Sequence, residues 1–475
     1  MAWASDECEG VDLKDRRLDE RMRLVMEQLG SHPTASIPAA CGGNAEMTAA
    51  YRFFNNPKVD FGNVLEPHIE ATHKRIAEYP IVLLVQDTTE IVLDRPQTQV
   101  VGAGPLDDSR RGLLVHPMVA FTPDGTPLGV VYAEAWARTD EGVPNTKRTR
   151  SERANIPIEE KESVRWVETY QQACEVAQRH PQTQFICAAD SEADIYELFE
   201  ETLRGPGNLH WLVRAAQDRA LVPGPDEEEP ARLLREQLLQ QEVLFTQTVQ
   251  VRGRQAKISN EKRGRKQPRE SRIAETEVRS GCVTFRPPWR PDRKLDPVTV
   301  HVVLVSEVNP PPDDTPVEWL LLTSLPNGDN DLVRLIIAYY CVRWMIEVYF
   351  RTLKSGCRVE ARRFEHVDRV YPCLAIYMIV AWRTLFVCRL GREFPDIDCE
   401  AVFEPAEWKS VYFVVNKKKP PKTPPSLQEM VRLVARLGGY INRKRKDEPG
   451  PQTVWLGLQR AHDIANCWLI FGPKE

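Results

Sequence analysis

Apolar residues fall along the chain in blocks that predict alternating strands and helices. IVLLVQDTTE at 81–90 is a continuous apolar run ending in an acid, which is typical of a buried strand whose C-terminal end faces a site. FICAAD at 185–190 has the same form. The segments 112–121 and 127–138 stand on either side of a PDG turn at 123–125, which predicts a β-hairpin or meander beside the first strand.

Helical patterns surround these strands. Residues 10–78 predict helices, with the turn NNPKVDF at 55–61 between two of them. Residues 158–179 predict another helix, and the segment after the second acid-ended strand predicts a further one capped by Ser191. Beyond Arg214 the chain becomes Pro-rich and charged, and short strands are predicted at 243–251, 275–286, 298–308 and 318–325.

The order of these elements predicts the fold class. Three strands, a helix, a strand, a helix, a β-rich insertion and then another helix are expected of an α/β fold with an RNase H-like core. Such a core is a mixed sheet flanked by helices, with ligands placed outside the strand ends. Further helical regions are predicted at both ends of the chain.

YYCVRWMIEVYFRTLK at 339–354 predicts a mostly buried helix that nevertheless carries charges. At about 100° per residue, its charged residues and one tyrosine fall within an arc of roughly 80°. They are Tyr340, Arg343, Glu347, Arg351 and Lys354. The stripe is either a ladder of ion pairs on a solvated face or a catalytic wall with one carboxylate between cations.

A catalytic wall requires partner acids, and two end the predicted buried strands. Asp87 and Asp190 could converge with Glu347 although all three lie far apart in sequence. An acid at the end of a strand is by itself more often a turn former. Three close carboxylates repel one another unless cations neutralise them, and hard oxygen ligands select Mg²⁺ or Mn²⁺. Two such ions would support phosphodiester chemistry.

Composition and charge indicate the cellular compartment and the kind of partner. The 475-residue chain has eleven cysteines without CxxC spacing, which predicts reduced thiols in a cytosolic protein. Its start is charged throughout, so no secretory signal is expected, and the apolar stretch 371–387 contains Arg383 and predicts a buried helix. The net charge of −5 argues mildly against nucleic acid, but four basic clusters favour phosphate binding. They lie at 14–23, 252–272, 416–422 and 442–446.

These motifs together resemble a known family. The spacing Y-x2-R-x3-E-x6-K from Tyr340 to Lys354 is similar to the signature of the insertion-sequence-four family of bacterial DDE transposases. DTT at Asp87, D-x-E-A-D-I from Asp190 and EWLLLTSLP at 318–326 resemble its transposon-five branch. Two further segments do so too, AAYRFFNNPKV at 49–59 and RLGGYINRKR at 436–445.

The resemblance implies a cut-and-paste DNA transposase. It would bind the inverted-repeat ends of its element in double-stranded DNA, pair two of them as a homodimer, cleave through a DNA hairpin and join to target DNA. By motif position, Asp87, Asp190 and Glu347 would be the metal-binding catalytic triad for two Mg²⁺ ions, with Mn²⁺ able to substitute. Tyr340, Arg343 and Lys354 would grip phosphates near the scissile bond.

Further DNA contacts follow from the same resemblance. Trp319 matches a tryptophan that stacks on a flipped base, the alternative being a core aromatic in a strand. Arg214 and His116 resemble neighbours of the active site. Phosphate contacts are also implied for Arg16, Arg17, Arg21 and Arg23, the alternative being an ordinary amphipathic surface.

The implied organisation has five parts. We expect a DNA-end-binding domain at 1–72, core segments at 73–215 and 327–370, a β-rich insertion at 216–326 and a dimerisation and DNA-contact domain at 371–475. The 252–272 segment is either a disordered loop or an added DNA contact. No membrane contact is expected, and the enzyme would act in the bacterial cytoplasm, at the nucleoid.

Three other classes have to be weighed against this one. An RNase H-like nuclease or resolvase would keep the acids but would need no end-binding module and no tryptophan for the hairpin. A domesticated, inactive DNA-binding descendant conflicts with the intact triad. A glycosidase with paired carboxylates receives no support from the basic clusters or from the charged stripe.

Overall fold

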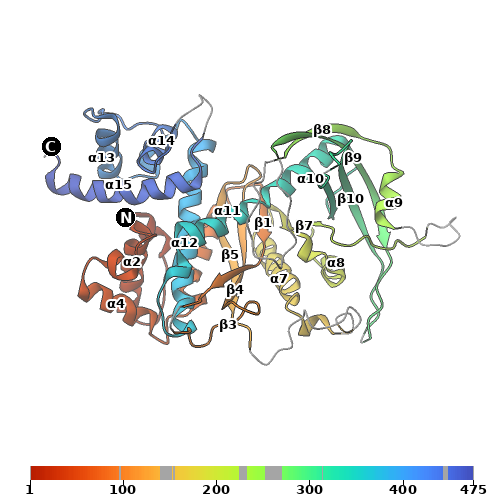
Figure 1. Ribbon diagram of the computed structural model, residues 1–475, viewed down its shortest axis with the longest axis horizontal. Coiled ribbons are helices and arrows are strands. Elements are labelled where there is room, and N and C mark those ends of the chain that lie inside the picture. The colour runs from red at the N-terminus through yellow and green to blue at the C-terminus, as the bar shows by residue number, and fades with distance from the viewer. Residues whose placement is uncertain are drawn as a thin grey trace. The chain divides into compact units, whose positions relative to one another are not determined.

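The computed structural model describes residues 2–95, 98–139, 152, 156–223, 233–251, 270–291, 293–312, 314–441 and 448–473. The chain forms two compact units. Unit 1 comprises Met1–Pro144 and Trp344–Glu475, and unit 2 comprises Asn145–Arg343. Figure 1 shows their elements. The basic segments 252–269 and 442–446 lie outside the described residues. All eleven cysteines are free, as predicted.

The N-terminal part of unit 1 is helical, as predicted. Its helices are α1 (Ala2–Glu7), α2 (Arg16–Ser31), α3 (Ile37–Cys41), α4 (Asn44–Phe54) and α5 (Phe61–Ile76). Asp15 caps α2 by accepting the Arg17 N–H, and Asp60 caps α5 by accepting the Asn63 N–H. The amphipathic face of α2 is buried. The predicted turn at 55–61 separates α4 from α5.

The sheet of unit 1 is built around β4. Its strands are β1 (Ile81–Gln86), β2 (Thr89–Val92), β3 (Gly104–Pro105), β4 (Arg111–Phe121) and β5 (Pro127–Trp136). β4 pairs antiparallel with the four others, and its hairpin with β5 confirms the prediction. Gly129 on β5 has φ +149°, and a Cβ there would lie 1.9 Å from Thr72 Oγ1, so only glycine lets β5 approach α5 this closely.

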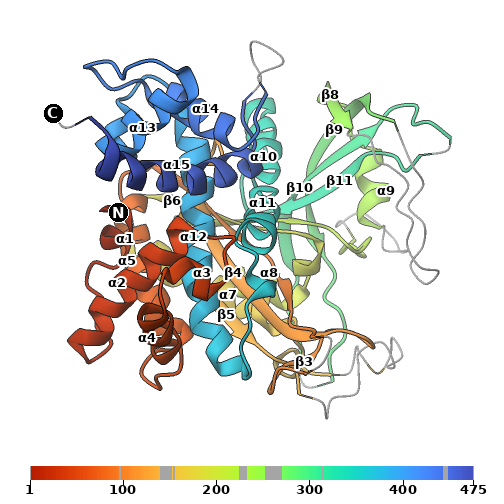
Figure 2. The ribbon, with the colours of Figure 1, turned by 60° about the vertical axis from the view of Figure 1, so that its left-hand side comes forward.

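The C-terminal part of unit 1 is helical. Its elements are α11 (Met345–Arg351), a π-helical turn (Thr352–Gly356), a 3-10 turn (Val359–Ala361), α12 (Val367–Glu393), a 3-10 turn (Cys399–Ala401), α13 (Pro405–Asn416), α14 (Leu427–Leu437) and α15 (Pro451–Phe471). α12 is long and apolar enough to span a membrane, but 78% of its apolar window is buried. It packs against α2, α5 and β5 (Figure 2), so the predicted buried helix is confirmed.

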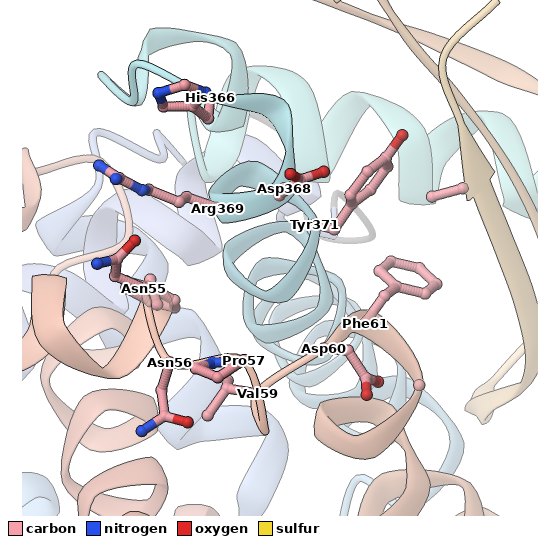
Figure 3. Close-up of a pocket in the computed structure, with 13 residues that line it drawn as sticks. Asn55, Asn56, Pro57, Val59, Asp60, Phe61, His366, Asp368, Arg369 and Tyr371 are labelled. Carbon is pink, nitrogen blue, oxygen red and sulfur yellow. The ribbon is translucent and has the colours of Figure 1, made fainter. Parts of the chain in front are cut away.

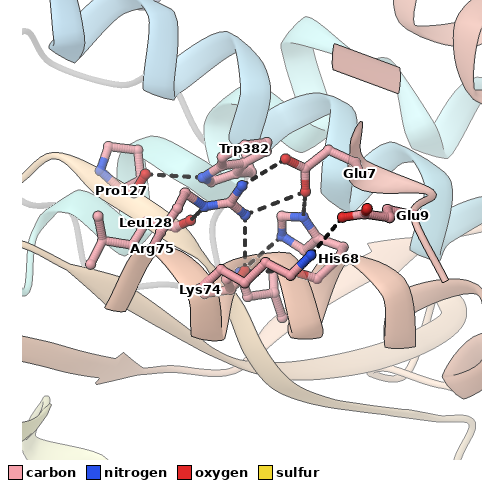
Figure 4. A network of polar contacts seen from close by, with 10 residues as sticks. Glu7, Glu9, His68, Lys74, Arg75, Pro127, Leu128 and Trp382 are labelled. Carbon is pink, nitrogen blue, oxygen red and sulfur yellow. Dashed lines mark hydrogen bonds and ion pairs between the residues drawn. The ribbon is translucent and has the colours of Figure 1, made fainter. Parts of the chain in front are cut away.

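A buried network of charged groups ties α1 to the rest of unit 1 (Figure 4). The Glu7 carboxylate lies 2.5 Å from His68 Nδ1 and 2.7 Å from Arg75 Nη1. His68 Nε2 accepts the Val130 N–H at 3.1 Å, so the ring proton sits on Nδ1 and is donated to Glu7. The Arg75 guanidinium lies 4.3 Å from the centre of the Trp382 ring. α1, α5, β5 and α12 are therefore joined by one closed set of contacts.

Unit 2 carries a mixed sheet. Its elements are a 3-10 turn (Ile158–Glu160), α7 (Val164–Arg179), β6 (Gln184–Ala189), a 3-10 turn (Ser191–Ala193), α8 (Tyr196–Thr202), β7 (Leu209–Arg214), α9 (Leu234–Leu239), β8 (Phe245–Val251), β9 (Arg272–Phe285), β10 (Val298–Glu307), β11 (Glu318–Thr323) and α10 (Asn330–Val342). β6 and β7 are parallel, and β11, β10, β9 and β8 follow antiparallel. The strands of the predicted insertion thus continue the sheet of β6 and β7. The predicted fold class, a mixed sheet flanked by helices with helical ends, is confirmed.

Two local predictions were wrong. Ser191 does not cap the segment after β6, because Asp190 is the cap residue and accepts the Glu192 N–H at 2.7 Å. The single helix predicted over 339–354 is interrupted: α10 ends at Val342 and α11 begins at Met345. At the junction the Arg343 N–H bonds to the Tyr340 carbonyl, a tighter turn than an α-helix makes.

Candidate active site and DNA-binding surfaces

Asp87 directly follows β1, as predicted, and is only 7% exposed. One of its carboxylate oxygens accepts the Thr88 N–H at 2.8 Å. His116, fully buried on β4, contacts both neighbours of Asp87. Its Nδ1 lies 2.7 Å from Thr88 Oγ1, and its Nε2 lies 3.1 Å from Gln86 Oε1. His116 therefore holds the backbone around Asp87 in place and acts on it indirectly.

Glu347 and Lys354 also lie in unit 1, the first exposed on α11 and the second half-buried in the π-helical turn. Burial lowers the pKa of Lys354, while the carboxylates of Glu360, Glu90 and Glu347 oppose that shift. Lys354 is therefore within electrostatic reach of Glu347, as the stripe predicted. A lysine surrounded by acids keeps a positive charge where a phosphate would otherwise be repelled.

Asp190 in unit 2 follows β6 and is half-buried. Its role as a cap fixes the carboxylate relative to the strand end before any ligand binds. Arg214 ends β7, which runs parallel beside β6, and its Nη2 donates to Ser191 Oγ at 3.2 Å. The guanidinium is thereby held at the residue next to Asp190.

Tyr340 on α10 lies within electrostatic reach of three other predicted site residues of unit 2, Arg343, Arg214 and Asp190. Burial raises its pKa, while the nearby Arg343 and Arg214 lower it and Asp190 raises it further. The Arg343 guanidinium carbon lies 5.7 Å from the Tyr340 ring centre. Within the described part of the chain, the buried Tyr340 hydroxyl finds no acceptor for its proton. This hydroxyl can therefore donate to an incoming oxygen.

Trp319 lies on β11 and is half-buried. Its ring centre is 6.3 Å from that of Tyr340, with the planes tilted by 55°. The indole is thus neither a fully buried core residue nor an isolated surface group. It lies against the tyrosine at the centre of the unit 2 cluster.

The three acids are divided between the units, with Asp87 and Glu347 in unit 1 and Asp190 in unit 2. Among the residues that the structure describes, no group of three or more His, Cys, Asp or Glu side chains is arranged to hold a metal ion. The donor chemistry still fits a hard divalent cation, because each candidate ligand is a carboxylate and two of them are accessible to solvent. The triad remains a prediction.

The predicted arginines of α2 are mostly exposed and lie beside acids. Arg16 Nε is 3.0 Å from Glu20, Arg17 Nη2 is 3.3 Å from Asp15, and the half-buried Arg21 is 2.5 Å from Glu46. Arg23 is exposed. Exposed ion pairs contribute little to stability, so they leave these cations able to exchange a carboxylate for a phosphate. Of the C-terminal basic clusters, the described one places exposed lysines after α13, at 417–419 and 422.

A hollow of about 600 Å³ lies between the α4–α5 turn and the start of α12 (Figure 3). Asn55, Asp60, Asp368 and Arg369 are among the side chains around it. Arg369 also lies 3.7 Å from the Glu365 carboxylate. The hollow carries charges of both signs, and no predicted site residue lines it.

One positioning residue was missed from sequence. The buried Asp194 carboxylate accepts the N–H groups of Ala216 and Gln217 at 2.7 and 2.8 Å and pairs with Arg219 at 2.5 Å. It thereby fixes the segment that follows Arg214. The signal was present as the second aspartate of D-x-E-A-D-I, but its role depends on a contact more than twenty residues away.

Three family models match successive parts of the chain. Residues 1–59 match the family model described as transposase DNA-binding, and residues 169–381 match the transposase DDE domain. Residues 379–467 match the transposase Tn5 dimerisation domain. One solved structure, a cryo-EM piggyBac transposase synaptic complex with hairpin DNA, is 11% identical over 82% of this chain and 72% of its own. Its TM-score is 0.36, too low to support any inference.

The matched domains and the mixed sheet define an enzyme that acts on DNA, and the protein is a DDE-class DNA transposase. It carries an N-terminal transposase DNA-binding domain and a C-terminal dimerisation domain of the Tn5 type. The predicted enzyme class, DNA partner and dimerisation are confirmed at this level. The DDE domain also implies dependence on a divalent metal ion.

Proposed function

We propose that this transposase works by the cut-and-paste route of the insertion-sequence-four family, in its transposon-five form. It binds the inverted-repeat ends of its element, pairs two ends as a homodimer, cleaves each through a hairpin and joins the 3′ ends to target DNA. The supporting observation is that Arg343, Arg214 and Asp190 all lie within electrostatic reach of Tyr340, while Glu347 lies within electrostatic reach of Lys354. All of them except Arg214 belong to the Y-x2-R-x3-E-x6-K and D-x-E-A-D-I motifs, and Arg214 resembles a neighbour of the active site.

In this proposal Asp87, Asp190 and Glu347 together hold two Mg²⁺ ions, which Mn²⁺ can replace. Bound ions of this kind make a water or a 3′-hydroxyl nucleophilic and stabilise the leaving oxygen. Contacts within the protein position two of these carboxylates before the ions bind. Asp190 is held as a cap, and the residues flanking Asp87 are held by His116.

Cations and one hydroxyl then hold the DNA near the scissile bond. Arg343 and Arg214 offer guanidinium groups that match phosphate geometry, and Lys354 offers a point charge. The Tyr340 hydroxyl donates its proton to a phosphate oxygen, because it has no acceptor among the described residues. Trp319 stacks on a base that has left the duplex, next to Tyr340.

Recognition and pairing use the two ends of the chain. The arginines of α2 contact phosphates of the transposon end. Near the C-terminus, α13 and α15 expose an apolar surface suited to a second copy of the chain, and Phe413 lies against Trp468 there. Its most exposed members are Leu469, Ile470 and Phe471. We expect the dimer to act in the cytoplasm, where the DNA lies.

Neutralising each acid tests the proposal. Asp87→Asn, Asp190→Asn and Glu347→Gln should each lower end cleavage by at least about a thousandfold, the scale of a lost charge-stabilising group in an active site. End binding should stay within about twofold, because these groups serve chemistry more than recognition. End cleavage and end binding are each measured on duplexes copied from the inverted repeats flanking the gene. Cleavage is measured with Mg²⁺ and with Mn²⁺.

Glu175→Gln, which neutralises an exposed carboxylate on α7, is the matched control and should cleave normally. Substantial nicking by any triad variant would overturn the assignment of that acid. Cleavage without preference for inverted-repeat ends would favour a nuclease or resolvase. A wild-type chain that binds ends but never cleaves them would indicate an inactive descendant.

A further inference from the structure

The described residues of the loop joining β9 to β10, 286–291 and 293–297, combine exposed cations and one exposed acid, Asp296, with an exposed indole. Trp289 is 73% exposed, and its ring makes no contact with another ring among the described residues. Arg286, Arg293 and Lys294 are exposed in the same loop. Leaving a whole indole in water forfeits a large hydrophobic contribution, which a partner molecule would recover.

The loop is held rigidly at both ends. The Tyr196 hydroxyl lies 3.3 Å from the Phe285 carbonyl and 2.8 Å from the Asp296 carbonyl, so it bridges the start and the end of the loop. The Arg286 N–H donates to the Ala220 carbonyl at 2.9 Å. Leu295 is buried beneath the loop.

The middle of the loop is held as well. Arg290 Nε lies 2.6 Å from Glu197, whose side chain is nearly fully buried. Arg290 Nη1 also donates to the Trp289 carbonyl at 3.2 Å. Burial would raise the pKa of Glu197, but Arg290 and Arg293 outweigh it and lower that pKa, so the anchoring carboxylate stays charged. Trp289 is thus presented outward from a loop that loses little entropy on binding.

The charge around the indole identifies the partner. Arg290 is neutralised by Glu197, but Arg286 and Lys294 have no ion-pair partner in the described part of the chain. Exposed cations beside an exposed aromatic face are the combination that binds nucleic acid without sequence preference, the cations to phosphates and the ring to a base or sugar. An apolar protein partner would leave these cations desolvated and unpaired.

We propose that the β9–β10 loop is a sequence-independent DNA contact of this transposase, with Arg286 and Lys294 on phosphates and Trp289 on an exposed base or sugar. The proposal rests on the DNA-processing function above and adds a surface outside its acids and phosphate-binding cluster. Cations that bind phosphates and an indole that stacks on a base or sugar could contact either the end of a duplex or a single strand.

The experiment measures binding of the full chain to a random-sequence 30-bp duplex and to a 30-nucleotide single strand, by fluorescence anisotropy at four salt concentrations. Trp289→Ala should weaken binding about 5- to 100-fold, and Trp289→Phe much less, because it keeps an aromatic face. Arg286→Ala with Lys294→Ala should reduce the salt slope on the duplex by about 1.8, the value for two phosphates. The form that loses more affinity with Trp289→Ala identifies the source of the stacked group.

Ile273→Ala is the matched control, since Ile273 on β9 is 70% exposed and apolar but stands outside the loop. Melting temperatures of all variants should agree with the wild type. Trp289→Ala binding both DNA forms as tightly as Ile273→Ala would overturn the proposal. So would a change in dimerisation, measured by sedimentation, with DNA affinity unaltered.

The two proposals fail separately. If the wild type never cleaves transposon ends but Trp289→Ala still loses DNA affinity, the loop contact stands and the cut-and-paste function falls. If end cleavage is normal and no loop variant changes DNA affinity, the reverse holds.

Discussion

The Glu7–His68–Arg75 network and the cluster around Tyr340 both crowd charged groups together, but they complete their contacts differently. In the network each charged group meets a protein partner: Glu7 meets a ring N–H and a guanidinium, and His68 accepts a backbone N–H. Around Tyr340, the hydroxyl proton has no acceptor among the described residues, and Arg343, Arg214 and the half-buried Asp190 all lie within electrostatic reach of it. Polar groups that are fully paired within the protein support the fold, and a buried hydroxyl without an acceptor is a candidate contact for a ligand.

Among the substitutions that test this comparison, Glu7→Gln is expected to cause the largest loss of stability. Glu7→Gln removes the acceptor of the His68 N–H and leaves Arg75 without its carboxylate, which should destabilise the protein by about 3–5 kcal/mol. Thermal unfolding measures it. Glu9→Gln is the matched control, because Glu9 pairs with Lys74 on the surface and should leave the melting temperature unchanged.

The network should also make stability depend on pH. Burial lowers the pKa of His68 below 6.5, so in acid the unfolded chain gains a proton that the folded chain refuses, and stability falls as the pH drops below about 6.5. Burial would raise the pKa of Glu7, but His68 and Arg75 outweigh it and lower it to about 2, so its stabilisation is lost between about pH 4.5 and 2. The second loss should be absent in Glu7→Gln. An identical acid profile in that variant would contradict the closed network.

In the cluster around Tyr340, a substitution should affect DNA binding more than stability, and Arg343 tests this. Arg343→Ala should weaken end binding about 10- to 100-fold and reduce its salt dependence, because a charge-assisted contact to phosphate is lost. Arg351→Ala is the matched control, since Arg351 is exposed on α11 and has no proposed role. If both variants bind alike at every salt concentration, the charged stripe is only a solvated ladder.

Trp319 gives the smallest and most selective effect. If its indole stacks on an extruded base, Trp319→Ala should spare first-strand nicking and impair hairpin formation by about 1–3 kcal/mol. Trp319→Phe should retain most of the function. Nicking, hairpin yield and melting temperature are measured on the same preparations. A uniform loss of all three would make Trp319 a packing residue, as cavity-forming substitutions do.

The sequence predicted what local patterns determine. β1 and β6 are six-residue strands with five apolar residues each, and Asp87 and Asp190 directly follow them. The sequence could not reveal that β11 pairs with β7, because strand pairing between distant segments has no local signal. The break between α10 and α11 was missed because no proline or glycine marks it. Ser191 and Asp190 are both good caps, and only geometry distinguishes them.

The site was predictable as a set of residues but not as a set of contacts. The motifs identified Tyr340, Arg343 and Arg214, yet their shared electrostatic influence with Asp190 depends on how a helix and two strands pack. The same holds for Asp194, whose partners lie in another segment.

Unit 1 is made from both ends of the chain, and this has a consequence for its synthesis. The helix that fills its core, α12, leaves the ribosome more than 200 residues after β5, which it covers. At about 5–20 residues per second, the nascent apolar faces of α2, α5 and β5 wait roughly 10–45 s for it. We therefore expect the N-terminal part of the growing chain to be a client of ribosome-associated chaperones, and fragments ending before residue 367 to aggregate.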